Sequence, residues 1–249
     1  MRAPRKAGAK HPMKTMILAA GRGERMRPLT DRLPKPMLTA GGKPLIVWHL
    51  ERLARAGLHD VVINHAWLGE TLEQGLGDGS RFGVRIRWSA EGTALETAGG
   101  IAFALPLLGD EPFLLINGDI WSDFDVARAR TLAAQLEASA LDAWCVLVDN
   151  PAHNPRGDFA LEGGWLANDG PRRLTYGGIA VYRPALFAGI ARGERAPLAP
   201  LLRAAAAGRQ AGAEYFDGRW ADIGTPARLA ELDAQLSAGG QGESPGVVR

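Results

Sequence analysis

Residues 15–25 read TMILAAGRGER, in which an apolar run passes directly into a glycine-rich turn. A run that is apolar nearly throughout is typical of a strand buried on both faces of a sheet. The turn is built from the small residues Ala19, Ala20, Gly21 and Gly23. Because these residues carry no long side chain, backbone N–H groups can closely approach a phosphate or the edge of a base. In open α/β sheets ligands bind at the carboxyl ends of the strands, so this stretch predicts a ligand site there.

Further apolar runs alternate with amphipathic stretches as far as residue 149. We predict strands at 15–20, 60–65, 84–89, 112–117 and 143–149. We predict helices between them at 44–56, 68–76, 97–105 and 126–139. This alternation is typical of a doubly wound α/β fold with a mostly parallel mixed sheet.

The pattern changes after Asn150, where prolines and glycine-rich turns separate shorter segments. Antiparallel strands are expected at 158–161, 165–167 and 174–183. Two helices, at 198–207 and 226–236, flank a further expected strand at 213–216. These segments predict a small antiparallel lobe. We expect one domain over 13–238, with halves 13–149 and 150–238 sharing one sheet, a disordered leader at 1–12 and a flexible tail at 239–249.

Composition excludes several classes of protein. Hydrophobic residues make up 46% of the chain and charged residues 22%, which excludes disorder of the whole chain. The single cysteine, Cys145, excludes a disulfide framework and a cysteine-based zinc site. No apolar run approaches the roughly 20 residues that span a bilayer, and the first twenty residues do not resemble a signal peptide. We therefore expect a cytoplasmic protein, a monomer or small homo-oligomer, with no membrane partner.

The distribution of charge argues against nucleic acid as a partner. Four basic residues lie in the leader, which contains no acidic residue: Arg2, Arg5, Lys6 and Lys10. Without them the net charge falls from +2 to −2, so the body of the protein is not basic.

Three interpretations of the glycine turn compete. A dinucleotide-binding turn needs a third glycine where Met26 stands and an acidic residue where the second strand ends in Asn64-His65. A P-loop needs Gly-Lys-Ser or Gly-Lys-Thr, which is absent. A phosphate-binding turn and a plain turn with solvated arginines both remain open at this point.

Lys35 favours the phosphate-binding turn. It stands between Pro34 and Pro36, which restrict the backbone and hold the ammonium group in one place. An ammonium group binds a phosphate oxygen as a compact point charge. Arginines at 22, 25 and 27 add to the positive charge, as a polyphosphate ligand requires. A solvated loop lysine is the alternative.

Four motifs occur in order along the chain: LAAGRGERMRPLT (18–30) with PKPM (34–37), LETAGGI (95–101), NGD (117–119) and WADIGT (220–225). Together they closely resemble the motifs of the sugar-1-phosphate nucleotidyltransferases. The resemblance covers about residues 14–237. Two further segments, NHAWLG (64–69) and GDGSRFG (77–83), most resemble the N-acetylmuramate-1-phosphate uridylyltransferases of bacterial cell-wall recycling.

The resemblance implies a Rossmann-like nucleotidyltransferase fold and a reaction between two small molecules. A nucleotidyl group would pass from an NTP, expected to be UTP, to a sugar-1-phosphate, expected to be N-acetylmuramate-1-phosphate, with release of pyrophosphate. Residues 13–149 would form the nucleotide-binding half and residues 150–238 the sugar-binding half. Because the attacking phosphate oxygen is already ionised, metal ions, cations and positioning should dominate catalysis.

The resemblance also implies roles for individual residues. Asp119 and Asp222 would hold Mg²⁺, which takes oxygen ligands. Arg25 and Lys35 would be catalytic, Arg25 on the β- and γ-phosphates and Lys35 either at the α-phosphate or on the sugar phosphate. Further contacts to the nucleotide are expected from Ala19, Ala20, Gly21, Gly23, Glu24, Thr97, Gly99 and Gly100. Glu96 could accept a hydrogen bond from the base or remain a solvated carboxylate.

The sugar-phosphate site is expected in the second half, with Asp222 and the candidates Asn117, Asp158, Asn168 and Gly178. As turn-forming residues, Asn and Asp could equally be structural. Many relatives carry a Glu-Lys pair in this lobe, whereas this chain has no lysine after Lys43. The alternatives are a guanylyl- or thymidylyltransferase acting on a hexose-1-phosphate, and a non-catalytic regulatory subunit of the same fold.

Overall fold

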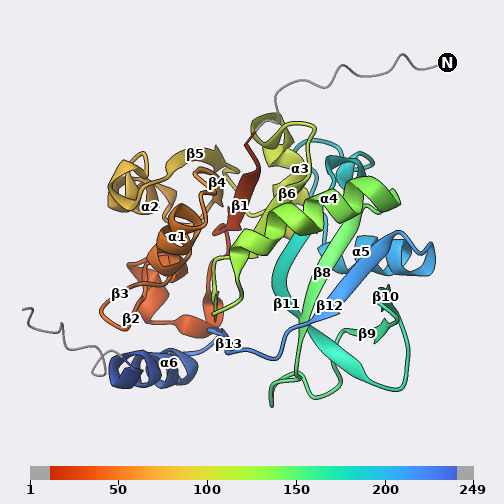
Figure 1. Ribbon diagram of the computed structural model, residues 1–249. Helices are drawn as coiled ribbons and strands as arrows, with labels where there is room; N and C mark the ends of the chain where they lie inside the picture. Colours follow the sequence, from red (N-terminus) through yellow and green to blue (C-terminus); the bar gives the residue numbers. More distant parts are fainter. Residues whose placement is uncertain (1–11, 240–249) are drawn as a thin grey trace, which may run out of the picture.

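The computed structural model describes residues 12–239 and has a nine-stranded mixed sheet at its centre (Figure 1). Four parallel strands form one side of the sheet, in the order β5, β4, β1, β6. Their bounds are Lys14–Leu18 (β1), Asp60–His65 (β4), Arg85–Ala90 (β5) and Phe113–Asn117 (β6). Leu18 pairs with both Asn64 and Asn117. The glycine turn after β1 therefore leaves the sheet beside the carboxyl ends of both neighbouring strands.

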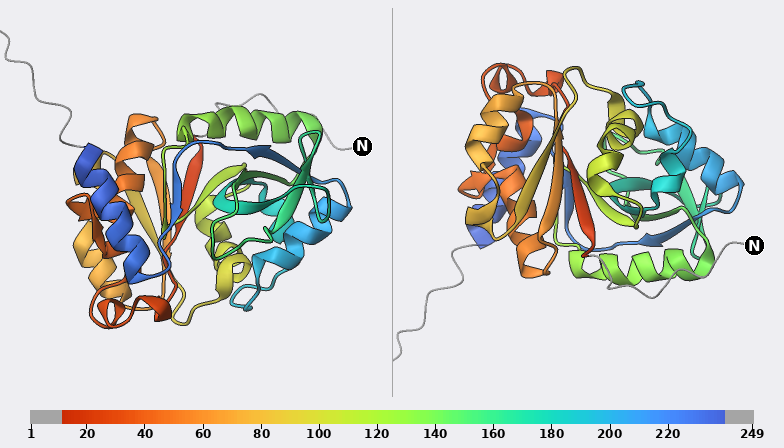
Figure 2. Two further views of the ribbon diagram at one scale, coloured as in Figure 1. Left: turned by 90° about the horizontal axis from the view of Figure 1, so that it is seen from below. Right: turned by 90° about the horizontal axis from the view of Figure 1, so that it is seen from above.

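Helices cover both faces of this sheet (Figure 2). One face packs against α1 (Leu45–Arg55), α2 (Gly69–Leu76) and α4 (Ala129–Ser139). The other packs against α3 (Glu96–Leu108) and α5 (Leu198–Ala207). Along β1, Ile17 belongs to the first of these two cores and Met16 to the second, and both are fully buried. Burial on both faces explains why the strands are apolar nearly throughout.

Residues 143–215 add five strands to the same sheet, in the order β11, β8, β12, β10, β9. Their bounds are Ala143–Val148 (β8), Phe159–Glu162 (β9), Trp165–Ala167 (β10), Arg173–Tyr182 (β11) and Ala211–Tyr215 (β12). β11 runs antiparallel to both β6 and β8, because the chain reaches it through the β9–β10 hairpin and not through a crossover helix.

The expected α/β fold with a mostly parallel mixed sheet is confirmed. Parallel pairing joins β5, β4, β1 and β6 and also the β8–β12 pair, while β10 and β11 run opposite to the other strands of the sheet. The functional division of 13–238 into two halves remains a prediction.

Two small antiparallel pairs lie outside the main sheet. They are β2 (Thr39–Ala40) with β3 (Lys43–Pro44), and β7 (Ile120–Ser122) with β13 (Trp220–Asp222). Helix α6 (Pro226–Gly239) follows β13 and lies beside β2, where Asp233 accepts a hydrogen bond of 2.8 Å from the Gly41 N–H. Short 3-10 turns occupy Glu24–Met26, Leu29–Asp31, Lys35–Met37, Ser80–Phe82, Val126–Arg128 and Pro184–Phe187.

Most expected elements occur within a few residues of their predicted bounds. The helix expected at 97–105 extends to Leu108, with Pro106 inside it. The strands of the β7–β13 pair were not predicted, since three residues are too few to show a pattern. Apart from Pro12 and Gly239, the leader and the tail lie outside the described residues. None of the helices within residues 12–239 has the length and apolar character that a membrane span requires.

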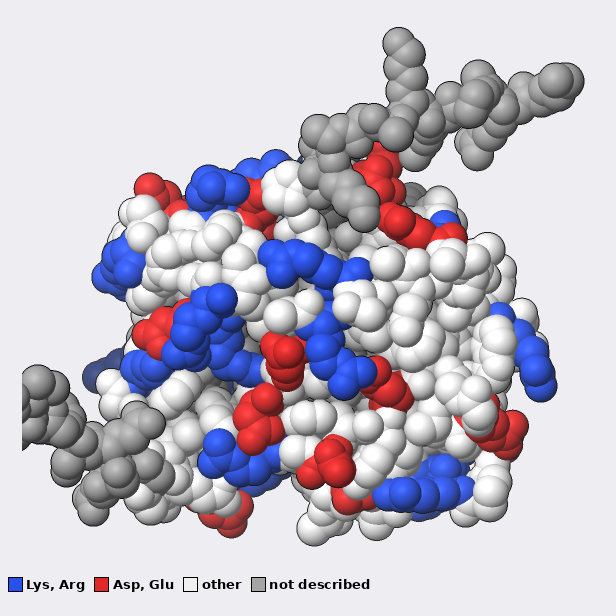
Figure 3. Space-filling view, in the orientation of Figure 1, with Lys and Arg blue, Asp and Glu red and all other residues white. Residues whose placement is uncertain are grey.

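Acidic side chains lie among the Lys and Arg side chains on the face of the molecule drawn in Figure 3. This mixture agrees with the absence of a basic excess in the body of the chain and gives no support to nucleic-acid binding.

Candidate active site

The glycine turn after β1 is held by its own side chains and backbone. Gly23 has φ +68°, and a β-carbon there would lie 3.0 Å from the Thr30 methyl group. The Thr30 hydroxyl donates to the Gly23 carbonyl at 2.8 Å, and Met26 N–H donates to the same carbonyl at 2.9 Å. Gly21 faces open space. The turn is therefore rigid at Gly23 and accessible at Gly21, as a turn that receives a phosphate requires.

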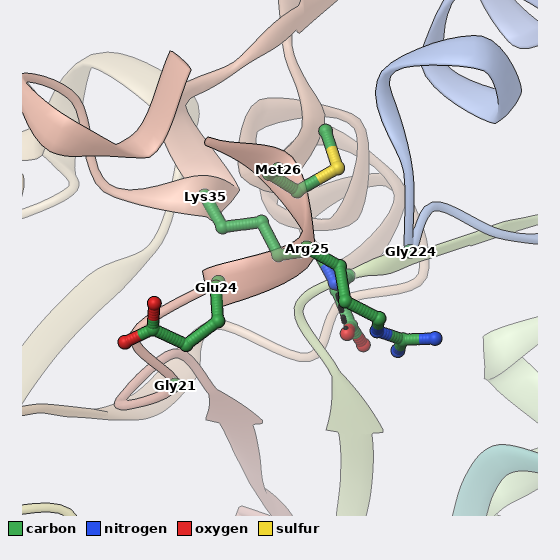
Figure 4. A pocket seen from close by; sticks show the side chains of 8 residues that line it. Gly21, Glu24, Arg25, Met26, Lys35 and Gly224 are labelled. Carbon is green, nitrogen blue, oxygen red and sulfur yellow. Dashed lines mark hydrogen bonds and ion pairs between the residues drawn. The ribbon is translucent and has the colours of Figure 1, made fainter. Parts of the chain in front are cut away.

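A pocket of about 240 Å³ opens beside this turn (Figure 4). Its lining residues are Gly21, Gly23, Glu24, Arg25, Met26, Lys35, Asp119 and Gly224. The structure thus brings both predicted catalytic cations, from residues 18–37, and one predicted metal ligand, Asp119, to a single pocket.

Lys35 is buried, and its ammonium group donates to Asp119 Oδ2 at 2.5 Å. Its backbone forms a 3-10 turn in which Met37 N–H donates to the Pro34 carbonyl at 2.8 Å. Burial and the turn together restrict the side chain to this position, as the Pro-Lys-Pro sequence predicted.

The three arginines of the glycine turn have different environments. Arg22 stacks 3.6 Å from the centre of the Trp67 ring and donates to the Thr30 carbonyl at 2.9 Å. Arg27 forms an ion pair of 2.8 Å with Asp31. Arg25 has no ion-pair partner among residues 12–239, and Figure 4 shows it extending toward the loop that carries Gly224. Arg25 is therefore the arginine of this turn that is available to an anionic ligand.

The two predicted metal ligands, 103 residues apart in the sequence, become neighbours through the β7–β13 pair. Asp222 pairs with Ile120, and Ile223 N–H donates to the Asp119 carbonyl at 2.9 Å. The described residues offer no cluster of three or more His, Cys, Asp or Glu side chains for a metal. Two carboxylates fit Mg²⁺ nonetheless, because this ion is commonly held by one or two carboxylates together with phosphate oxygens and waters.

Asp222 is also the meeting point of three segments. Its Oδ2 accepts hydrogen bonds from Arg228 Nη1 on α6 at 2.6 Å and lies 2.9 Å from His153 Nε2, which follows β8. Asp119 is thus paired with Lys35, 84 residues away in the sequence, and Asp222 is paired with Arg228 on the helix that follows it.

A family model described as Nucleotidyl transferase matches residues 14–157, which is more than half of the chain. The chain belongs to the nucleotidyl transferase family. It is 51% identical over 231 residues to the N-acetylmuramate alpha-1-phosphate uridylyltransferase of Neisseria meningitidis, a match that covers 91% of this chain and 99% of the relative. A protein of the same name from Caulobacter vibrioides is 33% identical over 242 residues, covering 91% and 98%. These relatives confirm that the chain is a sugar-1-phosphate nucleotidyltransferase, as its resemblance to the motifs of that family predicted.

Solved structures confirm the fold of this nucleotidyltransferase. A Bacillus anthracis protein described as a glucose-1-phosphate thymidylyltransferase superposes with a TM-score of 0.77 at 19% identity, covering 90% of this chain and 95% of that one. An apo UDP-glucose pyrophosphorylase superposes with a TM-score of 0.70, also at 19% identity, covering 92% and 99%.

The candidate sugar residues of the nucleotidyltransferase divide into two groups. Gly178, with φ +71°, lies against Asn117: a β-carbon there would be 2.8 Å from Asn117 Nδ2. Asn117 Oδ1 is buried and has no hydrogen-bond partner within residues 12–239. By contrast, Asp158 accepts from Tyr176 N–H at 2.9 Å, and Asn168 donates to the Arg203 carbonyl of α5 at 3.0 Å. Asp158 and Asn168 therefore make structural contacts, and both Asn117 Oδ1 and Asn168 Oδ1 are buried acceptors without a hydrogen-bond partner within the described residues.

The segment expected to contact the base is packed against protein. A β-carbon on Gly99 would lie 2.3 Å from the Glu194 carbonyl, and one on Gly100 would lie 2.5 Å from Glu91 Oε1. Glu96 has φ +61° and pairs with Arg195 at 2.8 Å. The two glycines thus allow close packing of the start of α3, and their predicted contact with the nucleotide remains a prediction.

Sequence reasoning missed a buried link behind the glycine turn. Asn64 accepts from Ala19 N–H at 2.8 Å and donates to Glu91 at 2.6 Å, while Glu91 accepts from Leu95 N–H at 3.0 Å. Burial raises the pKa of the Glu91 carboxyl, against the opposing effect of these hydrogen bonds. An asparagine at the end of a buried strand was the only signal in the sequence. His153 and Arg228 gave no signal.

Proposed function

We propose that this nucleotidyltransferase moves a uridylyl group from UTP to N-acetylmuramate-1-phosphate, in the presence of Mg²⁺, and releases pyrophosphate. The observation that carries the proposal is the meeting of Arg25, Lys35 and Asp119 in one pocket, with Asp222 brought to Asp119 by a strand pair. The choice of UTP and this sugar is supported by the names of the two relatives that span nearly the whole chain. Since UTP is an intracellular nucleotide, this function predicts a cytoplasmic location.

The reaction joins two anions, so electrostatic stabilisation and alignment account for most of the catalysis. The attacking oxygen of the sugar phosphate is already ionised, and no general base has to remove a proton from it. Lys35 would place a fixed positive charge beside the α-phosphate, where charge develops in the transition state. Arg25 would bind the β- and γ-phosphates through its planar guanidinium group and hold the departing pyrophosphate.

Asp119 and Asp222 would hold Mg²⁺ at the end of β6 and in β13. When bound, the ion would neutralise phosphate oxygens and help align the attacking and leaving oxygens. Lys35, which is held on Asp119 by its ion pair, would lie beside that site.

The glycine turn would receive the triphosphate through its backbone. Gly21 leaves space on that side, and the hydrogen bonds at Gly23 keep the turn in one conformation. The link from Asn64 to Ala19 would hold the beginning of the turn against β4. A preorganised turn avoids the cost of ordering the backbone when the nucleotide binds.

The test is to incubate the purified protein with Mg²⁺, pyrophosphatase and each NTP against a panel of sugar-1-phosphates, and to measure released phosphate. Release with UTP and N-acetylmuramate-1-phosphate, and much less with other pairs, is the expected result. A preference for another pair would overturn the proposed specificity, and no release with any pair would overturn the proposed activity.

A further inference from the structure

Arg228, at the beginning of α6, is a third cationic group beside the pocket. Its Nη1 donates to Asp222 Oδ2 at 2.6 Å and to the Asp222 carbonyl at 3.1 Å, which fixes the guanidinium group. A β-carbon on Gly224, which lines the pocket, would lie 2.8 Å from Arg228 Nη2 and 3.1 Å from Arg25 Nη2. The guanidinium groups of Arg25 and Arg228 therefore both lie beside the same glycine.

The donor that faces Gly224 is unused. Nε of Arg228 lies 3.4 Å from the Thr225 hydroxyl and Nη1 is engaged by Asp222, but Nη2 has no acceptor among the described residues. The side chain is 21% exposed, so it is held firmly and yet reaches solvent. A guanidinium group with one edge anchored and another edge available is suited to bind an oxyanion.

The charges around the pocket favour an anionic ligand. Lys35 and Arg228 are each paired with one carboxylate, on Asp119 and Asp222, and Arg25 has no ion-pair partner within residues 12–239. Glu24 also lines the pocket, but its carboxylate lies within 4.0 Å of Arg22 and Arg27. Arg25 is therefore a cation beside the pocket that no carboxylate of the described residues offsets.

The position of Arg228 favours the sugar phosphate over the triphosphate. Arg25 belongs to the glycine turn, whereas Arg228 meets His153, from the segment after β8, on the Asp222 carboxylate. In the same strand, β13, Trp220 Nε1–H donates to the Gly177 carbonyl at 2.8 Å. The next residue, Gly178, lies against Asn117. Through the Asp222 carboxylate, Arg228 is therefore linked to His153 in the 150–238 half of the chain.

The sequence supplies an independent reason. The chain contains no lysine after Lys43, so within residues 150–238 only arginine offers a permanent positive charge. Other arginines of this half are committed elsewhere: Arg173 donates to the Asp158 carbonyl at 2.8 Å, Arg195 pairs with Glu96, and Arg219 pairs with Asp123. Arg228 is the arginine of this half that contacts a predicted metal ligand.

We propose that Arg228 binds the phosphate of the sugar-1-phosphate through Nη2, while its Nη1 remains on Asp222. This inference rests on the proposed function only for the identity of the sugar. Arg25 and Arg228 then divide the anions between them: Arg25 holds the pyrophosphate that leaves, and Arg228 holds the phosphate that attacks.

The test compares Arg25→Ala and Arg228→Ala in both directions of the reaction, using the NTP and sugar-1-phosphate pair that the wild type converts best. For Arg228→Ala the KM for the sugar-1-phosphate, and in reverse for the nucleotide sugar, should rise about tenfold or more, as expected for a lost charge-assisted hydrogen bond. Its KM for the NTP and for pyrophosphate should change less than about twofold. Arg25→Ala should show the opposite pattern.

Three controls keep the test decisive. Arg85→Ala removes an equal charge at the other end of the sheet, where Arg85 pairs with Asp60, and should leave all four KM values unchanged. Arg228→Lys keeps the positive charge but not the planar guanidinium group, so its KM for the sugar-1-phosphate should lie between those of the wild type and Arg228→Ala. If Arg228→Ala unfolds, Arg228→Lys takes its place in the comparison with the wild type. Thermal melting of each variant separates misfolding from lost binding.

A fall in kcat with an altered Mg²⁺ requirement and an unchanged KM for the sugar-1-phosphate would overturn the inference, because Arg228 would then only position Asp222. A rise in the KM for pyrophosphate would overturn it as well. If the best pair is not UTP with N-acetylmuramate-1-phosphate, the proposed specificity fails, while the pattern of KM values still tests Arg228.

Discussion

The two sides of the pocket are built in different ways. The glycine-turn side comes from residues 18–37, a continuous stretch in which Gly23, Thr30 and Lys35 contact one another. The opposite side is assembled from three distant segments, which supply Asp119, His153 and the Asp222–Arg228 pair. A local motif can therefore specify half of the site, whereas the other half exists only when the sheet is complete.

The largest expected effect follows from removing the carboxylate that both sides share. Asp119→Asn takes away a predicted metal ligand and the partner of Lys35, and turnover should fall by roughly 10²–10³-fold or more. Pyrophosphate release under saturating substrates measures it. The matched control is Asp123→Asn, four residues along the chain, whose carboxylate pairs with Arg219. Equal activity of both variants would separate Asp119 from the chemistry.

Lys35→Ala should lower turnover by about 10²-fold, because a fixed charge beside the developing negative charge is lost. Lys35→Arg should recover little, since the planar guanidinium group cannot reproduce the compact contact of the ammonium group with Asp119. Lys43→Ala, at a lysine that pairs with Glu51, provides the control. If Lys35→Ala keeps activity within about twofold of wild type, the rigid Pro-Lys-Pro turn has no catalytic purpose.

Arg22→Ala and Arg25→Ala test which arginine of the turn binds the nucleotide. Arg25→Ala should raise the KM for UTP about tenfold, because its unpaired guanidinium group is assigned to the phosphates. Arg22→Ala should change that KM less than about threefold, since Arg22 is engaged by Trp67 and Thr30. The reverse ranking in steady-state kinetics would contradict the assignment.

Asn64→Ala should affect stability more than chemistry. It leaves the Ala19 N–H and Glu91 Oε1 without a partner in a buried place, which should lower the free energy of unfolding by about 1–3 kcal/mol. Asn64→Asp should be worse, because it places a second carboxylate beside Glu91. Urea denaturation measures both, with Asn168→Ala as a more exposed comparison. Wild-type stability for both Asn64 variants would show that the link behind the turn is unimportant.

The same contrast explains what the sequence could predict. The glycine turn, the Pro-Lys-Pro segment and the strands β1, β4, β5, β6 and β8 were predictable, because periodicity and turn chemistry act over a few residues. The insertion of β11 between β6 and β8 was not, since it depends on strands far apart in the chain. The contacts of the Asp222 carboxylate with Arg228 and His153 were equally hidden, because no pattern in the sequence marks them.

The glycines that were predicted to contact the nucleotide differ in what lies beside them. Gly21 faces open space, whereas Gly99 and Gly100 are small because other parts of the protein pack against them. A glycine in the sequence indicates close approach but not what approaches. The structure was needed to separate approach by a ligand from approach by the chain itself.

The most direct test of the account is whether the β7–β13 pair brings Asp119 and Asp222 together as one metal site. Binding of Mn²⁺, an oxygen-seeking substitute for Mg²⁺, can be followed by electron paramagnetic resonance in the presence of UTP, without turnover. Asp119→Asn and Asp222→Asn should each weaken binding by about tenfold or more, while Asp123→Asn should bind as the wild type does. Wild-type Mn²⁺ affinity in both Asp119→Asn and Asp222→Asn would contradict the metal site and the mechanism built on it.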